Sequence, residues 1–547
     1  MASRLPVECL RRIFEDIVTI DINLDPFSRK DGVIYSNLNH LHSCILVNRT
    51  WCDTAMPLLW KDPLHWLSVR HDEVVNQIQL PTPWKERFQF FIPFTFTRSN
   101  RLPLLISTYF TCLPEKSRRS LKANKAFKGS EFIMDVNPYF DYPFFLERLN
   151  LPILVNAVSM WNSQYQTVDE SFDEDSDTEE EILPVSVLAE KLLRMFMERS
   201  GNLKYLSHMK SNISIQCAVV IKSNLAVFPG AKLTLSKITS FHFNASSIKK
   251  PEKYYQALAR ICHSIENLEI HFLSNDSKGL ASLIESQRGL LRLLIHGGSG
   301  TSYFGNDSGK IYNYVVKALE KKVKNLTYLS YQCNGGIPLG TFASCKKLER
   351  LLLHTLYYHS SDSFVRSEFP HLKSLYIEDG SFLINHQIRI IQNSGGSITE
   401  IVNCMSEPRD PDNLTSFYET VMGFCPNLIN FEYYISKDQF SLIPNLFNKC
   451  NKLQKLTFHS ASLPSDTAEI NDILTRMGEV IPEKLQKIEI PWHFTFSAES
   501  LASFLRGCHK RLKEPLRFKA CIPTEEHRDI LELYVNRGVL RENSPTF

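Results

Sequence analysis

The sequence lacks the features that mark secreted, membrane-spanning and metal-dependent proteins. None of its 547 residues belongs to an uncharged apolar run of 18, and the first residues, MASRLPVECLRRIFEDI, contain no apolar signal core. Its 13 cysteines form no Cys-x-x-Cys pair, and there is no His-Glu-x-x-His motif. We therefore expect no membrane partner, no metal and no cofactor. We expect a cytoplasmic or nuclear chain, or one found in both compartments, with reduced thiols.

Strong charge bias is also missing. A formal net charge of +3 predicts no nucleic-acid partner, and 21 glycines and 27 prolines exclude collagen-like or low-complexity composition. The exception is DESFDEDSDTEEE, residues 169–181, which holds nine carboxylates and no basic residue. Such a segment repels itself and cannot bury an apolar face. It predicts an acidic disordered loop over residues 168–182.

What the sequence does contain is an internal repeat. The frame apolar-x-x-apolar-x-apolar recurs between residues 203 and 518, at intervals of 22 to 36 residues. Clear copies begin at Ile238, Ile265, Leu290, Leu326, Leu348, Leu372, Leu428, Leu453 and Leu485, and weaker copies at Leu203, Ile398 and Leu512. The alternation within each frame predicts one strand with one buried face, and the segments between frames have helical spacing.

One strand and one helix cannot close a core alone, but stacked units can. Cys262, Cys345, Cys425 and Cys450 each stand three residues before a frame begins. A thiol that recurs with the structural unit indicates a small buried side chain where helix meets strand. The pattern is that of degenerate leucine-rich repeats. We predict an α/β fold with a curved parallel sheet and one strand and one helix per repeat.

The N-terminal block has a different pattern. LPVECLRRIFEDI (5–17) carries one apolar stripe at helical spacing, and LHSCILVNRTWCDTAMPLLW (41–60) carries a second, with Trp51 and Trp60. About sixty residues are few for an independent core. Two interpretations therefore remain open. The indoles fill a small core, or part of this apolar surface binds a partner protein.

Specific residues in this block resemble the F-box. Leu5-Pro6-x-Glu8, Ile13, Val47-x-Arg49-x-Trp51 and Leu59-Trp60 follow the pattern of this module, by which substrate receptors dock on the Skp adaptor of SCF-type cullin ubiquitin ligases. The resemblance implies that the adaptor contacts are Leu5, Pro6, Ile13, Leu46, Val47, Trp51, Leu59 and Trp60. Residues 18–37 separate the first helix from the rest by more than the family usually allows.

An F-box followed by degenerate leucine-rich repeats is similar to the expanded F-box family of arbuscular-mycorrhizal fungi. PGAKLTLSKI, ICHSIENLEI and GFCPNLINFEYY extend the likeness along the chain. It implies a substrate receptor of a cullin-RING ligase, with a Skp-type adaptor and an unknown protein substrate as partners. The domains expected are an F-box at 1–66, a helical linker and cap at 67–200, and the solenoid at 201–547.

The frames also suggest where a substrate binds. Side chains between and just after the apolar positions should point to the concave face of the solenoid. They form a ragged row of histidines, tyrosines and bases, namely His271, Arg292, His296, Tyr328, Arg350, His354, Tyr376, Lys455 and His459. We hypothesise that this row contacts the substrate, with an acidic segment as its ligand. Polar side chains on an exposed face need no function, which is the alternative.

Two other functions were weighed. An enzyme would need a motif, and HGGSGTSYFGNDSGKI (296–311) fails as a phosphate-binding loop because Phe304 and Ile311 stand where Gly and Ser or Thr are required. We therefore expect no catalytic site. The second alternative is a binding scaffold without ubiquitin chemistry, in which the N-terminal block only caps the repeats.

Overall fold

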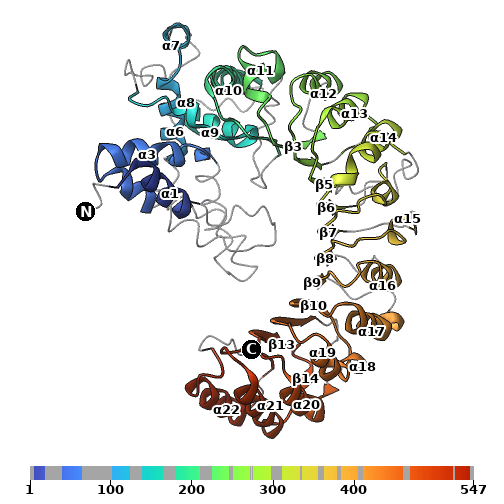
Figure 1. The fold of residues 1–547 in the computed structure, drawn as a ribbon. Coiled ribbons are helices and arrows are strands. Elements are labelled where there is room, and N and C mark those ends of the chain that lie inside the picture. The colour runs from blue at the N-terminus through green and yellow to red at the C-terminus, as the bar shows by residue number, and fades with distance from the viewer. Residues whose placement is uncertain are drawn as a thin grey trace. The chain divides into compact units, whose positions relative to one another are not determined.

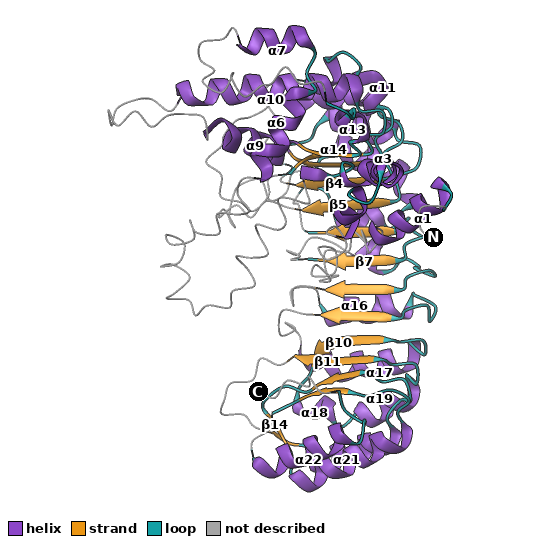
Figure 2. Cartoon of the chain, turned by 90° about the vertical axis from the view of Figure 1, so that its left-hand side faces the viewer, coloured by secondary structure: helices purple, strands orange, loops and turns teal. Residues whose placement is uncertain are grey.

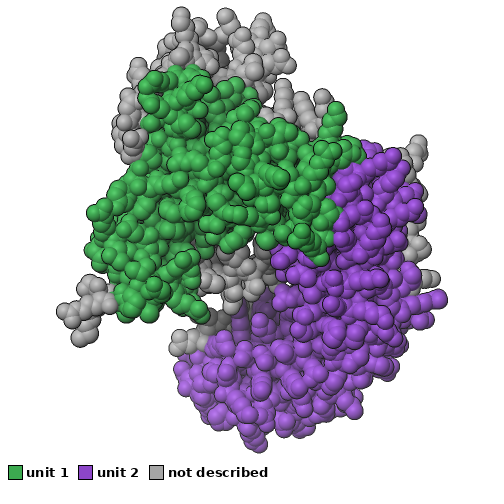
Figure 3. All heavy atoms as spheres, turned by 45° about the horizontal axis from the view of Figure 1, so that its top comes forward, with its two compact units in different colours: residues 1–265, 286–288 green, residues 266–285, 289–547 purple. Residues whose placement is uncertain are grey.

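The computed structural model describes residues 5–18, 40–64, 101–122, 138–163, 179–209, 224–245, 251–271, 273, 275–296, 311–332, 336–354, 362–377, 383–403, 411–459, 468–521 and 524–541. The chain divides into two compact units, coloured green and purple in Figure 3. The first comprises residues 1–265 and 286–288, and the second residues 266–285 and 289–547. Most of the predicted acidic loop and the glycine-rich stretch 297–310 lie outside the described residues.

The first unit begins with helices and continues with strands. Its longer elements are α1 (Val7–Val18), α3 (Arg49–Leu59), α6 (Arg101–Thr111), α7 (Glu115–Lys122), α8 (Tyr142–Phe145), β1 (Arg148–Asn150), α9 (Leu151–Ser163), α10 (Glu179–Arg199), β2 (Tyr205–His208), α11 (Ala231–Leu235), β3 (Ser240–Asn244) and α12 (Pro251–Ala259). Two differences from expectation stand out. Residues 179–182 form the first turn of α10, and β1 lies inside the segment interpreted as linker.

The second unit repeats a strand and a helical segment. Its strands are β4 (Asn267–His271), β5 (Arg292–His296), β6 (Tyr328–Tyr331), β7 (Arg350–Leu353), β8 (Ser374–Ile377), β9 (Glu400–Asn403), β10 (Asn430–Tyr434), β11 (Lys455–His459), β12 (Ala468–Glu469), β13 (Lys487–Glu489), β14 (Phe494–Thr495) and β15 (Arg517–Lys519). Its helices are α13 (Lys278–Ser286), α14 (Asn313–Lys322), α15 (Asp362–Val365), α16 (Ile384–Gln392), α17 (Leu414–Phe424), α18 (Lys437–Phe440), α19 (Ile443–Lys449), α20 (Asn471–Val480), α21 (Ala498–Arg511) and α22 (Glu525–Asn536), as Figure 1 shows.

Within the first unit, β1, β2 and β3 are parallel neighbours in chain order. Within the second unit, the described strands β4 to β11, β13 and β15 follow one another in the same parallel way. In the second unit the strands lie side by side and point the same way, with the helices on one side of them (Figure 2). We call the other side of these strands the helix-free face. This is a mixed α/β fold of the leucine-rich-repeat type. Every predicted frame from Leu203 to Leu485 contains a strand, as the apolar alternation indicated.

Within each unit the register repeats because successive strands are hydrogen-bonded in the same way. The carbonyl of Glu349, just before β7, accepts bonds from the N–H groups of Lys373 and Ser374 at 2.7 and 3.0 Å. Nearly every strand of both units repeats this arrangement. The carbonyl of the residue just before the strand accepts two hydrogen bonds from backbone N–H groups at the start of the next strand. The last predicted frame is displaced. Leu512 is half-buried, and the inward positions of β15 are Leu516 and Phe518.

The recurrent cysteines lie where the repeat predicted. Cys262, Cys345, Cys425 and Cys450 are all buried. The thiol of Cys450 approaches the carbonyl of Cys425 at 3.4 Å, so one junction contacts the next. Burial raises the pKa of the Cys262, Cys345 and Cys450 thiols to about 12. These thiols therefore stay protonated at neutral pH, as packing groups do and nucleophiles do not.

Candidate functional sites

The N-terminal block builds a small core of its own. Leu10 and Phe14 of α1 pack with Leu41 and Ala55, and all four are buried. Phe14 meets Trp51 edge to face, with ring centroids 5.3 Å apart. The side chain of Asn48 caps α3 by accepting a hydrogen bond from the Trp51 N–H at 2.9 Å, which satisfies one of the unpaired donors at the helix start.

Beside this core, apolar side chains remain exposed. Leu5, Pro6 and Ile13 on or just before α1, and Leu46 and Val47 in the turn before α3, are all exposed. Leu46 is 74% exposed and Ile13 is 45% exposed. Ile13 follows Leu10 by three residues and therefore sits at the edge of the buried stripe of α1. We call these five residues the apolar surface. They belong to the eight positions predicted to contact an adaptor.

The other three predicted contacts are partly buried. Trp51 and Leu59 pack against the small core. Trp60 lies against Tyr109 of α6 and Tyr142 of α8, with ring centroids 5.4 and 4.0 Å apart. The interpretation that the indoles fill a small core agrees with these contacts, and partner binding stays a prediction. The tryptophans contribute to packing, while an apolar surface remains next to them.

The block is also tied to the first strand. The carbonyl of Lys61 accepts hydrogen bonds from the N–H groups of Glu147 and Arg148 at 2.9 and 3.1 Å, the same pair of bonds that links successive repeats. The guanidinium of Arg148 binds the carboxylate of Asp62 at 2.8 Å and stacks over Tyr205 of β2 at 3.8 Å. A partly buried arginine–carboxylate pair of this kind fixes the orientation of the segments that it joins more firmly than an exposed pair does. The N-terminal block and the start of the sheet therefore form one packed body.

In the second unit, the predicted row divides into three levels on the helix-free face. The first level holds Arg292, Tyr328 and Arg350, which are register neighbours on β5, β6 and β7. Arg292 stacks over the Tyr328 ring at 4.0 Å, which leaves Tyr328 only 2% exposed. Arg350 is exposed, whereas Tyr328 presents almost no surface to a substrate. Tyr376 of β8 lies at the second level, in register with Leu352.

The third level gathers histidines at the ends of the strands. His271 and His296 are register partners, and their rings stack with centroids 4.3 Å apart. His354 lies two strands further along, with its ring 5.2 Å from that of His296. Burial, with His271 and His354 nearby, lowers the pKa of His296 to about 4. His296 is therefore neutral at physiological pH, and contact between these histidines and a substrate stays a prediction.

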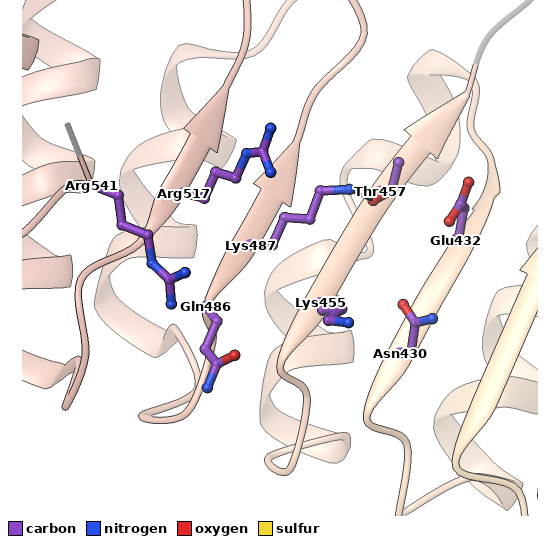
Figure 4. Close-up of a pocket in the computed structure, with 8 residues that line it drawn as sticks. All are labelled: Asn430, Glu432, Lys455, Thr457, Gln486, Lys487, Arg517 and Arg541. Carbon is purple, nitrogen blue, oxygen red and sulfur yellow. Dashed lines mark hydrogen bonds between the residues drawn. The ribbon is translucent and has the colours of Figure 1, made fainter. Parts of the chain in front are cut away.

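Lys455 and His459 of β11 lie apart from these histidines. His459 pairs with Glu432 of β10 at 2.8 Å. Lys455 lines a pocket of about 370 Å³ on β10, β11, β13 and β15, together with Asn430, Glu432, Thr457, Gln486, Lys487, Arg517 and Arg541 (Figure 4). Four cationic side chains and one carboxylate line this pocket, which therefore has an excess of positive charge. We call it the basic pocket.

The sequence missed part of the basic pocket. Arg517 occupies the level-one position of the last repeat, equivalent to Lys455 and Lys487 by register, so a correctly placed frame would have found it. Arg541 belongs to no frame. It reaches the pocket because residues 540 and 541 return beside β15, where the Arg541 N–H donates to the Leu516 carbonyl at 3.0 Å. No local sequence signal marks that return.

Comparisons with known proteins add little. No protein-family model and no curated protein matches this sequence. Among solved structures, a Bacteroides fragilis protein aligns with 11% identity over 63% of this chain and 84% of its own, with a TM-score of 0.25. An internalin from Listeria monocytogenes aligns with 13% identity over 55% of this chain and 80% of its own, with a TM-score of 0.30. Scores this low support no inference, and the repeat fold is established by strand order and register.

Across the described ranges, every helix is too short or too polar to cross a lipid bilayer.

Proposed function

We propose that this chain is the substrate-recognition subunit of an SCF-type cullin-RING ubiquitin ligase. The N-terminal block docks on a Skp-type adaptor, and the repeats bind a target protein. The observation that carries the proposal is the apolar surface. Ile13, Leu46 and Val47 stay exposed on a block that has already buried Phe14 and Leu41 in its own core. Exposed apolar side chains beside a packed core are typical of protein interfaces.

The attachment to the sheet supports the same proposal. Because Lys61 and Asp62 are bonded to Glu147 and Arg148, a partner bound to the apolar surface is held in a fixed relation to the first strands. A receptor needs this property to present a target to an enzyme. In this proposal the chain carries no catalytic site of its own and works in the cytoplasm, the nucleus or both. Its membership of an F-box family of fungal type belongs to the same proposal.

For the target, the basic pocket favours an acidic segment. Lys455, Lys487, Arg517 and Arg541 supply more positive charge than Glu432 offsets. A lining of this kind attracts carboxylate-rich peptides and suppresses binding of basic ones. Arg350, also exposed on the helix-free face, adds to the same preference.

A second function is favoured by one observation. The Lys61 carbonyl makes the same pair of bonds to β1 that each repeat makes to the next, so the N-terminal block covers the edge strand of the sheet as a cap does. A cap alone would fit a leucine-rich-repeat binding scaffold without ubiquitin chemistry. A cap needs no exposed Leu46, however, so the two functions differ in what that side chain does.

Co-purification of the full chain with a Skp-type adaptor tests this. Leu46→Asp should abolish capture of the adaptor, because it places a charge where an apolar contact forms. Leu233→Asp on α11 is the matched control, since Leu233 is 75% exposed against 74% for Leu46. It should leave capture unchanged. An adaptor that fails to bind the wild-type chain, or binds both variants equally, would favour the scaffold.

A further inference from the structure

The third level of the helix-free face contains a cluster that no sequence motif announces. Glu269 and His271 come from β4 and His296 from β5, and one ligand atom from each lies within 4.8 Å of the others. All three side chains are partly buried. The Nε2 of His271 is 2.6 Å from a carboxylate oxygen of Glu269, which orients that imidazole toward the carboxylate. His354 stands next to His296 and completes a group of three histidines and one carboxylate.

We infer that this cluster binds a divalent transition-metal cation of the zinc type. Imidazole nitrogen and carboxylate oxygen are donors that Zn²⁺ takes at about 2.0–2.2 Å, so tetrahedral ligand atoms lie about 3.4 Å apart. The separations in the cluster, 2.6 Å for one pair and at most 4.8 Å for the others, bracket that value. Binding an ion would replace the contact between His271 and Glu269 by two bonds to the ion, since a metal-bound imidazole nitrogen carries no proton.

The surroundings also hold the histidine beside the cluster in place. The hydroxyl of Ser330 lies 2.8 Å from Nε2 of His354, and β6 between β5 and β7 spaces the two histidines. His354 therefore stands as a neighbour of the three candidate ligands, with its Nε2 next to Ser330.

The repeat explains why the sequence does not reveal the site. Metal motifs are recognised when ligands lie a few residues apart on one element, as in Cys-x-x-Cys. Here His271 and His296 are 25 positions apart in sequence, yet they are register partners on adjacent strands. Strands in a sheet lie about 4.8 Å apart, so equivalent side chains of successive repeats meet. The inference goes beyond the proposed function, and it holds whether or not an adaptor binds.

A cobalt titration of the full chain, freed of any affinity tag and of bound metal, tests the inference. We expect one Co²⁺ per chain with visible d–d bands and no thiolate charge-transfer band, and displacement of the Co²⁺ by Zn²⁺. His296→Ala should weaken binding by more than about 100-fold, since losing an outer-shell partner alone costs 10–100-fold. Glu269→Gln keeps the side-chain shape and should also weaken binding.

His459→Ala is the matched control. His459 also ends a strand beside a carboxylate, Glu432 at 2.8 Å, but it belongs to no group of three potential ligands among the described residues. Cobalt binding by this variant should equal that of the wild type. A wild-type chain that takes up no Co²⁺, or a folded His296→Ala chain that binds it as tightly, would overturn the inference. Circular dichroism of each variant confirms folding.

Discussion

Helices α20 and α21 of the second unit pack so closely that one added methyl group should push them apart. An ideal Cβ at Gly507 of α21 would lie 2.2 Å from the carbonyl oxygen of Gly478 in α20 and 2.4 Å from its carbonyl carbon. Both atoms belong to the backbone, so no side chain can rotate away. Gly507→Ala therefore forces the two helices apart.

The magnitude follows from two opposing effects. Overpacking that shifts the backbone costs about 1–3 kcal/mol. Replacing a helical glycine by alanine returns roughly 0.5–1 kcal/mol of conformational entropy and propensity. We expect a net loss of about 1–2 kcal/mol from the free energy that holds α20 and α21 closed.

Gly423→Ala in α17 should have the opposite effect on stability. A Cβ there meets no atom within 4 Å, so only the favourable effect remains and we expect a gain of about 0.5 kcal/mol. Amide hydrogen exchange is the suitable assay, because repeat arrays open locally and a single unfolding midpoint averages over the units. Faster exchange in α20 and α21 of Gly507→Ala, and unchanged or slower exchange in α17 of Gly423→Ala, are predicted. Equal protection in the first variant would refute the packing described above.

Two further predictions concern the first unit. Phe14→Ala should unfold the N-terminal block locally, because Phe14 is 1% exposed and a buried phenylalanine truncation costs about 3–5 kcal/mol; circular dichroism and proteolysis near residue 14 measure it, and a fully protected block would contradict it. Burial lowers the pKa of His208 to about 3, below the unfolded value of about 6.5, so the unfolded chain binds more protons in that interval. Stability is therefore complete above about pH 6.5 and falls as the pH drops toward 3. The Tyr254 hydroxyl lies 2.8 Å from His208, and Gln at this position can keep that hydrogen bond. His208→Gln should therefore reduce the dependence of stability on pH, measured by urea titrations at several pH values. An unchanged dependence would show that His208 does not cause it.

The repeat could be predicted from sequence because its signal is physical and local. Most strands bury two alternate apolar residues, so the frame predicts the strand directly, and even β1 obeys it through Leu146, Leu149 and Leu151. That copy is hard to recognise in the sequence because helical spacing dominates the residues around it.

What the sequence could not give is which side chains meet across repeats. Tyr328 occupies the outward position that the apolar alternation predicts, yet Arg292 stacks over its ring and covers it. The predicted row contains no acidic residue, yet Glu269 and Glu432 each pair with one of its histidines. Such pairs depend on register and rotamer, which a single sequence does not encode in any local pattern.

The central claim is that the N-terminal block docks on an adaptor through its apolar surface. Hydrogen exchange of the full chain, with and without a saturating Skp-type adaptor, tests it most directly. We predict new protection confined to residues 5–18 and 40–60, which carry Ile13, Leu46 and Val47, and none in the repeats of the second unit. Protection that appears only in the repeats, or nowhere, would contradict it.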